Sequence, residues 1–352
     1  MRILKEIKIG NKIISKQRDT FIIAEISANH NQDIEIAKKM IREAKRIGAD
    51  AVKIQTYTAD TITLDCDNEY FRIKQGTIWD GKTLHNLYKE AYTPWEWHEE
   101  LMSTAKDENI ICFSTPFDKS AVDFLEKLDV PAYKIASFEI TDISLIKYAA
   151  SKGKPMIIST GIATIQEIQD AVEVCKSVGN EQIILLKCTS SYPAPLDEIN
   201  LKTIPNLSET FDVVSGLSDH TLGTIVPIGA VALGAKVIEK HFILDRSMGG
   251  PDAVFSLDVS EFSEMVNCVR SIEKALGKVS YSLSEKNLKN REFSRSLFIS
   301  EDVKAGDIIT EKNVKSVRPG YGISPKHLEK IINQRFKDGY KKGTPMQWNY
   351  IK

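Results

Sequence analysis

The chain has 352 residues, of which 42% are hydrophobic, and its 47 basic and 48 acidic side chains leave a net charge of −1. This balance argues against a general nucleic-acid binder, whose phosphate contacts need a basic excess. Five scattered cysteines without a CxxC pair indicate neither a disulfide framework nor a zinc ribbon. No apolar run reaches membrane-spanning length, and the first residues lack an apolar signal region. We therefore expect a cytoplasmic protein with neither nucleic acid nor membrane as a partner.

Short apolar, β-rich runs alternate with amphipathic helical segments after an opening hairpin-like stretch that turns at Gly10 and Asn11. The helical segments show a period near 3.6, as in Ile34, Ala37 and Ile41. The β-rich runs cover residues 21–27, 51–57, 110–117, 132–137, 156–161, 183–190, 213–220 and 237–244. Strand–helix units repeated in this way predict an α/β fold, a (β/α)8 TIM barrel. An open doubly wound sheet is the alternative, although no glycine-rich nucleotide fingerprint follows the first run.

The pattern changes after a helix predicted near residues 259–276. We predict a barrel domain over residues 1–280, a polar linker over 281–294, and a small second domain over 295–352. That last segment combines short strand-like runs, near 295–300 and 303–309, with Gly and Pro turns. A unit of this size has little core of its own, so we expect it to dock on a larger body.

A long insertion, residues 58–93, follows the second run and is rich in aspartates and aromatic residues. Long loops at the carboxyl ends of barrel strands usually cover or line a site. The alternative is a surface excursion without a role.

Polar residues close each barrel run, at the end where such barrels build active sites. Period-two alternation places Lys53 and Gln55 on the same face of their strand. Lys53 and Lys134 lie inside apolar runs, where a charge is costly unless something compensates it. Two such lysines suit a ligand with a phosphate and a carboxylate. A buried pair with Glu25 and a Schiff-base lysine are the alternatives.

Two histidines, His220 and His241, stand at the carboxyl ends of consecutive runs. Neutral imidazoles at neighbouring strand ends are suited to share one divalent cation. Taken alone, each is better explained as a hydrogen-bonded core or rim histidine, and it is the rest of the chain that favours the metal. The adjacent Asp219 and Lys240 are either groups that orient the histidines or a plain rim ion pair.

Read in order, these motifs carry a family pattern over nearly the whole chain. They cover residues 24–26, 29–31, 53–56, 114–118, 133–137, 159–161, 186–189, 192–193, 216–221, 239–242 and 250–252. The sequence resembles the sialic acid synthases, a family that comprises N-acetylneuraminate, pseudaminic acid and legionaminic acid synthases. Residues 318–323 resemble the antifreeze-protein-like (SAF, β-clip) domain of that family. The insertion looks most like the pseudaminic branch, and Ser190 stands where neuraminate enzymes usually carry Asn.

The resemblance implies a metal-dependent condensation of phosphoenolpyruvate with an open-chain amino-sugar aldehyde. For the pseudaminic branch the acceptor is 2,4-diacetamido-2,4,6-trideoxy-L-altrose, and the products are pseudaminic acid and phosphate. Catalytic roles fall on Glu25, His220 and His241, and the two histidines would hold Mn²⁺ or Mg²⁺, with Co²⁺ also suitable. Phosphoenolpyruvate contacts fall on Lys53, Thr115, Lys134, Ser137, Ser159, Ser190 and Ser218. Sugar contacts fall on Gln55, Tyr192, Glu239, Asp252 and Arg318.

The resemblance also implies a domain-swapped homodimer, in which Arg318 completes the barrel site of the other subunit. A solvent-exposed turn arginine is the alternative. Other readings of the function stay open from the sequence. They are a neuraminate or legionaminate synthase that uses N-acetylmannosamine or a diacetamido-trideoxy-mannose, a metal-free Schiff-base aldolase, another phosphoenolpyruvate-condensing barrel, and a non-enzymatic carbohydrate-binding protein.

Overall fold

The structure, a computed structural model, describes residues 6–74, 76 and 79–352. Thr77 and Ile78 of the insertion motif and the first five residues of the predicted barrel domain lie outside the described residues. The chain divides into two compact units, Met1–Gly277 and Lys278–Lys352. Each unit is described by itself.

In the described part of the first unit, parallel strands form a closed barrel in the order β10-β3-β4-β5-β6-β7-β8-β9. The strands are β3 (Phe21–Glu25), β4 (Ala51–Thr56), β5 (Ile111–Pro116), β6 (Tyr133–Ile135), β7 (Met156–Ser159), β8 (Ile183–Cys188), β9 (Val214–Asp219) and β10 (Val237–His241). Each strand lies within one of the predicted runs. The predicted TIM barrel is therefore confirmed, and the open sheet is excluded because β10 pairs with β3.

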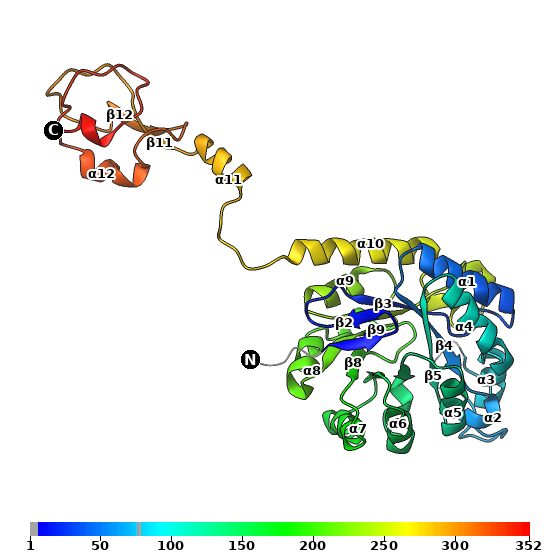
Figure 1. Cartoon of the computed structure of the whole chain (residues 1–352). Helices are drawn as coiled ribbons and strands as arrows, with labels where there is room; N and C mark the ends of the chain where they lie inside the picture. The colour runs from blue at the N-terminus through cyan, green and yellow to red at the C-terminus, as the bar shows by residue number, and fades with distance from the viewer. Residues whose placement is uncertain (1–5, 75, 77–78) are drawn as a thin grey trace. The chain divides into compact units, whose positions relative to one another are not determined.

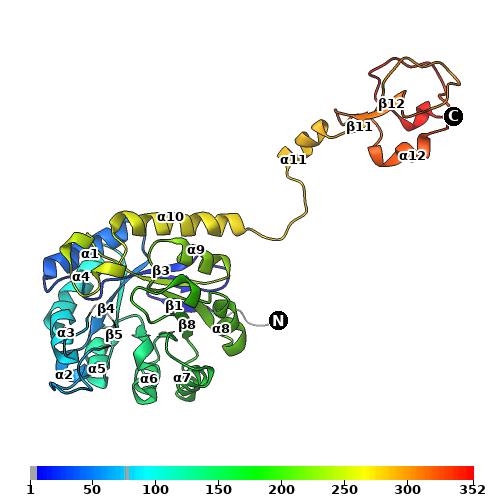
Figure 2. The same ribbon diagram turned by 180° about the vertical axis from the view of Figure 1, so that it is seen from behind.

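Helices surround the strands, as Figures 1 and 2 show from opposite sides. The main ones are α1 (Ile34–Arg46), α4 (His98–Asp107), α5 (Lys119–Lys127), α6 (Ile143–Ala150), α7 (Ile165–Ser177), α8 (Thr203–Phe211), α9 (Ile225–Ala232) and α10 (Val259–Leu276). Helix α1 illustrates why they form and pack. The Asp33 side chain accepts hydrogen bonds from the first backbone N–H groups. A stripe at helical spacing, which includes Ala37 and Ile41, packs in one buried cluster with Val52 of β4.

The amino-terminal end of the barrel is closed by apolar side chains. The predicted hairpin forms as β1 (Ile7–Ile9) and β2 (Lys12–Ile14). Ile7, Ile9 and Ile14 of the hairpin share a buried cluster with residues at the start of the barrel strands, such as Phe21, Ala51 and Val237. This end is packed with apolar side chains, and the polar strand ends lie at the opposite, carboxyl-terminal mouth of the barrel.

The insertion contains α2 (Ala59–Ile62) and α3 (Leu84–Ala91). Trp79, between them, donates a hydrogen bond from Nε1 to the carbonyl oxygen of Pro251, at 3.1 Å. Pro251 belongs to the segment that follows β10. The insertion therefore reaches the carboxyl-terminal side of the barrel, as predicted.

The second unit pairs β11 (Ser296–Ile299) with β12 (Val314–Val317) in antiparallel fashion and adds the short helix α12 (Leu328–Ile331). Its core includes Leu297, Ile309 and Phe336. The predicted strand near residues 303–309 forms isolated bridges at Val303 and Ile308 instead. The predicted linker contains the helix α11 (Glu285–Asn290). No helix in the described ranges of either unit is long and apolar enough to cross a membrane.

Candidate active site

Three charged or titratable residues stand side by side at the barrel mouth. Strand register aligns His241 of β10 with Glu25 of β3, and Glu25 with Lys53 of β4. Lys53 Nζ lies 2.7 Å from Glu25 Oε2 and 3.6 Å from Oε1 of Glu239. The buried Lys–Glu pair considered from the sequence is therefore present, but Lys53 is shared between two carboxylates. Burial raises the pKa of Glu25 to about 7, although Lys53 opposes the shift.

Lys134 is the second buried cation of the mouth. Its Nζ donates to Ser159 Oγ at 2.7 Å and lies 3.7 Å from Oε1 of Glu239. Ser218 Oγ donates to the same carboxylate oxygen at 3.2 Å. Burial opposes ionisation of Glu239, but Lys134 and Lys53 together hold its pKa below the ordinary value. Glu239 is thus a carboxylate held between two lysines.

A group of hydroxyls and one backbone amide lies beside the lysines. The N–H of Gly161 donates to Ser137 Oγ at 3.1 Å. A Cβ at Gly161 would lie 2.2 Å from Ser190 Oγ and 2.7 Å from Ser137 Oγ, so only glycine lets these hydroxyls converge there. Lys53 donates to Thr115 Oγ1 at 3.1 Å. Cations, hydroxyls and an amide in this arrangement suit a phosphate or a carboxylate.

The two predicted metal ligands are neighbours, with His220 and His241 ring centroids 5.3 Å apart. Nδ1 of His220 lies 3.1 Å from the Thr189 carbonyl oxygen, a contact that leaves Nε2 for a metal. His241 Nδ1 is buried without a hydrogen-bond partner among the described residues. Burial holds the pKa of His241 well below its ordinary value, so this imidazole is neutral, as a metal ligand must be.

The donor set fits a divalent cation held by two histidines. Over the described ranges, no group of three or more His, Cys, Asp and Glu residues is arranged to hold a metal ion. Two protein ligands would leave coordination positions for substrate and water. Burial disfavours charge on His220, but the nearby Cys188 and the Thr189 carbonyl raise its pKa above the ordinary value. Protons therefore compete with a cation for this ring more strongly than for His241.

Asp219 and Lys240 form an ion pair whose side chains are fully buried. Lys240 Nζ also donates to the carbonyl oxygen of Thr221. The two residues directly precede His220 and His241 and are register partners in β9 and β10. Complete burial excludes the exposed rim ion pair, and the position indicates a brace between the strands that carry the histidines.

Of the predicted sugar contacts, Tyr192, Asp252 and Gln55 belong to the barrel unit, whereas Arg318 belongs to the second unit. Tyr192 lies beside His220, at a ring-centroid distance of 4.5 Å, and Asp252 Oδ2 lies 3.9 Å from Nδ1 of His241. Gln55 stands two residues beyond Lys53 on β4. Arg318 is exposed in the second unit, directly after β12. Its part in the site stays a prediction.

Sequence reasoning missed Glu139, which lies in the loop after β6, two residues beyond Ser137. Its Oε2 is buried and has no hydrogen-bond partner in the part of the chain that the structure describes. Burial raises the pKa of Glu139 to about 7, although Lys134 opposes the shift. Glu139 ends a short 3-10 turn, Ser137–Glu139, and a glutamate at such a position is usually interpreted as a solvated side chain. Its position two residues beyond Ser137 gave no signal of burial.

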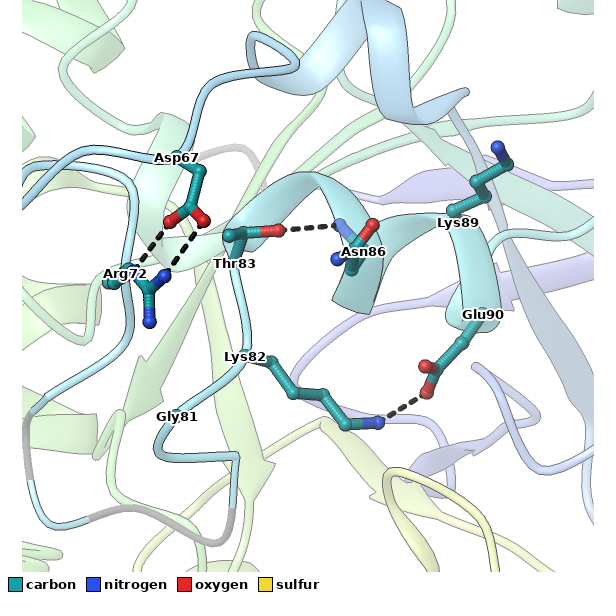
Figure 3. A pocket seen from close by; sticks show the side chains of 8 residues that line it. All are labelled: Asp67, Arg72, Gly81, Lys82, Thr83, Asn86, Lys89 and Glu90. Atoms are coloured by element: carbon teal, nitrogen blue, oxygen red, sulfur yellow. Dashed lines mark hydrogen bonds and ion pairs between the residues drawn. The ribbon is translucent and has the colours of Figure 1, made fainter.

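The insertion also carries a surface hollow of about 450 Å³, shown in Figure 3. Four of its charged side chains form two ion pairs, Arg72 with Asp67 and Lys82 with Glu90, and Lys89 also lines it. It contains none of the predicted site residues, so the chemistry is assigned to the barrel mouth.

The class of protein follows from the barrel fold and the polar groups at its mouth, together with two family matches. Residues 40–281 match the NeuB family, and residues 294–352 match the SAF domain. The chain therefore belongs to the NeuB family and ends in a SAF domain, which confirms the resemblance read from the sequence.

Individual members of the family are similar to this chain over most of its length. A pseudaminic acid synthase from Campylobacter jejuni is 50% identical over 93% of this chain and 95% of its own length. A pseudaminic acid synthase from Helicobacter pylori is 46% identical over 92% of this chain and 96% of its own length. The crystal structure of a sialic acid synthetase from Leptospira borgpetersenii superposes with a TM-score of 0.73. It is 33% identical and covers 83% of this chain and 98% of that one.

Proposed function

We propose that this protein is a pseudaminic acid synthase. It would join phosphoenolpyruvate to 2,4-diacetamido-2,4,6-trideoxy-L-altrose and release phosphate. The observation that carries the proposal is the placement of Lys53 and Lys134 on either side of Glu239, at the mouth that also holds His220 and His241. A carbohydrate-binding protein has no need of two buried lysines beside a histidine pair.

Phosphoenolpyruvate brings a phosphate and a carboxylate, and the mouth offers two cationic groups to neutralise them. Lys134 with Ser159 forms one, and Lys53 with Thr115 forms the other. The hydroxyls of Ser137, Ser190 and Ser218 add hydrogen-bond donors. When the substrate anions arrive, they compete with Glu239 for the lysines. We expect the carboxylate of Glu239 then to turn to a hydroxyl or amide N–H of the sugar.

The reaction forms one bond between carbons and breaks one between carbon and oxygen. Carbon 3 of phosphoenolpyruvate bonds to the aldehyde carbon, and the aldehyde oxygen gains a proton and becomes a hydroxyl. Water adds to carbon 2 to give a tetrahedral centre. The bond from carbon 2 to the phosphate oxygen then breaks and leaves the 2-keto acid. Of the two water protons, one ends on the former aldehyde oxygen and the other on phosphate.

Glu25 is the group best suited to hold the attacking water and accept its proton. Its pKa near 7 places it between acid and base at working pH. Its Oε1 is buried and has no hydrogen-bond partner in the described ranges. Carboxylate charge at Glu25 and Glu239 also favours positive charge that develops at carbon 2. A divalent cation on His220 and His241, Mn²⁺ or Mg²⁺, would polarise the aldehyde carbonyl as a Lewis acid.

Within the family, two observations favour the pseudaminic acceptor. The relatives named as pseudaminic acid synthases are 46% and 50% identical to this chain, against 33% for the sialic acid synthetase of known structure. Ser190 also stands beside the Gly161 amide, at the position where neuraminate enzymes usually carry Asn. A neuraminate or legionaminate synthase is the alternative within the same family.

The proposed assembly is a homodimer in which the second unit of one subunit serves the barrel of the other and Arg318 contacts the sugar. Its support is the family resemblance and the exposed position of Arg318 beside Pro319 and Gly320. Because phosphoenolpyruvate is a cytoplasmic metabolite, we place the reaction in the cytoplasm.

Isotope labelling tests the proposed bond cleavage. Phosphoenolpyruvate with ¹⁸O in the oxygen that bridges carbon 2 and phosphorus is turned over with the diacetamido altrose and Mn²⁺. We expect all of the label in the released phosphate. Label retained in the keto acid would indicate P–O cleavage and contradict the proposal. Borohydride trapping of a lysine would instead indicate a Schiff-base aldolase.

A further inference from the structure

An aromatic wall, defined here as Trp79, Tyr192 and Phe255, runs from the insertion to the histidine pair. The Trp79 and Tyr192 ring centroids are 5.7 Å apart, and those of Tyr192 and Phe255 are 5.2 Å apart. Tyr192 lies 4.5 Å from the ring of His220, and Phe255 lies 4.9 Å from the ring of His241. Segments far apart in sequence thus form one apolar surface that starts at the predicted metal ligands.

The three rings differ in what they can offer a ligand. Phe255 is 1% exposed and so supports the wall from behind. Trp79 and Tyr192 are only partly buried and present the accessible surface. The single donor of the indole is already committed, because Nε1 of Trp79 bonds the Pro251 carbonyl oxygen at 3.1 Å. Trp79 can therefore offer a substrate an apolar ring face but no hydrogen bond.

The same bond places the ring beside the predicted sugar contacts. Pro251 directly precedes Asp252, whose carboxylate accepts a hydrogen bond from Ser27 and lies near His241. A ligand that reaches from the histidine pair towards Asp252 and Tyr192 therefore meets the indole at its far end.

We infer that Trp79 determines acceptor specificity by receiving the apolar, deoxygenated end of the sugar against its ring face. The inference rests on the proposed function and deepens it. Packing a methyl group on the indole removes apolar surface from water, which favours binding. A hydroxymethyl group in the same place loses its water hydrogen bonds and finds no donor or acceptor on Trp79 in exchange.

A purely structural role is the competing explanation, since Trp79 also ties the insertion to the segment after β10. The two explanations predict different kinetics. A loosened insertion would slow every acceptor alike, whereas loss of an apolar subsite would act on the acceptor with the methyl group.

The test compares two acceptors of the same configuration, 2,4-diacetamido-2,4,6-trideoxy-L-altrose and its 6-hydroxy counterpart. kcat/KM for each is measured by phosphate release in the wild type, Trp79→Phe and Trp79→Ala. Trp95→Ala is the matched control. Trp95 also donates from Nε1 to a backbone carbonyl, that of Tyr57 at 3.1 Å, but its ring stacks on Phe124. Phosphoenolpyruvate affinity, measured by calorimetry, checks that each variant keeps its barrel site.

We expect the wild type to prefer the 6-deoxy acceptor, and Trp79→Ala to reduce that preference by about tenfold, the usual worth of one methyl group in an apolar pocket. Trp79→Phe keeps a ring face and should retain most of the preference, and Trp95→Ala should leave the ratio unchanged. An equal loss for both acceptors in Trp79→Ala, or an unchanged ratio, would overturn the inference and leave the proposed function standing. Failure of the wild type to release phosphate with either acceptor would overturn both.

Discussion

Lys53 Nζ lies 2.7 Å from Glu25 Oε2, and both side chains are almost completely removed from solvent. A buried pair of this kind is weak evidence for stability, because the desolvation of both charges offsets their attraction. Glu239 shares the same lysine. We interpret the arrangement as a preformed anion site, in which Lys53 and Lys134 are positioned to bind a substrate that carries two anionic groups.

Replacing Glu25 with Gln should slow turnover without abolishing substrate binding. The amide keeps the volume but cannot accept a proton from water, so we expect kcat to fall by at least about a hundredfold. The dissociation constant of phosphoenolpyruvate, measured by calorimetry, should change far less. Glu35→Gln, on the exposed first turn of α1, is the control. An undiminished kcat in Glu25→Gln would remove this residue from the chemistry.

Replacing Lys134 with Met should weaken phosphoenolpyruvate binding. The change removes a charged donor to the substrate and leaves Glu239 closer to an anion, so we expect KM for phosphoenolpyruvate to rise by about a hundredfold. Lys152→Met serves as the matched control, because Lys152 pairs with Asp123 on the outside of the barrel. Equal KM values in the two variants would contradict the assignment.

Replacing Glu139 with Gln should stabilise the protein at alkaline pH. Folding raises the pKa of Glu139 from 4.5 to about 7 through burial. Between these values the unfolded chain is ionised while the folded carboxyl stays protonated, so stability falls as pH rises through this window. Above pH 7 this effect lowers the free energy of unfolding by on the order of 3 kcal/mol, and Glu139→Gln does not have this loss.

Urea denaturation of the wild type and Glu139→Gln at pH 5 and pH 8 measures this difference. The gain in unfolding free energy should be larger at pH 8. A group that costs stability at the barrel mouth is best explained by use in the reaction, so activity should fall in the same variant. A gain independent of pH would show that the carboxyl is already ionised in the folded protein.

Removal of metal should lower thermal stability as well as activity. A ligand that binds the folded state alone at a hundred times its Kd stabilises it by about 2.7 kcal/mol. We therefore expect Mn²⁺ to raise Tm in chelator-treated wild type, and His241→Ala to lose this shift. His327→Ala, in the second unit, should retain it. A normal shift in His241→Ala would place the metal elsewhere.

Much of the barrel could be predicted from the sequence, because apolar periodicity reports directly which face of each strand and helix is buried. Lys53 and Lys134 stood out because a charge inside an apolar run is costly, and the two histidines because they stand at the carboxyl ends of consecutive runs. The contact between Lys53 and Glu239 could not be predicted from the sequence. The two residues are 186 positions apart in the numbering and meet only because the barrel closes. Trp79 and Pro251 are likewise brought together by the fold, 172 residues apart.

The burial of Glu139 could not be predicted from the sequence. No sequence pattern after a barrel strand indicates that a carboxylate oxygen is buried, because burial there depends on how neighbouring barrel loops pack. The run near residues 303–309 failed as a strand for a related reason. An apolar alternation supports a strand only when a partner edge pairs along its length, and here pairing is confined to single bridges.

The most direct test of the proposed function is phosphate release from phosphoenolpyruvate with Mn²⁺. The 6-deoxy diacetamido altrose is compared with N-acetylmannosamine, each with and without chelator. Metal-dependent release with the altrose alone is the predicted result. Release with N-acetylmannosamine would assign the enzyme to the neuraminate branch, and release that survives the chelator would contradict the role given to His220 and His241.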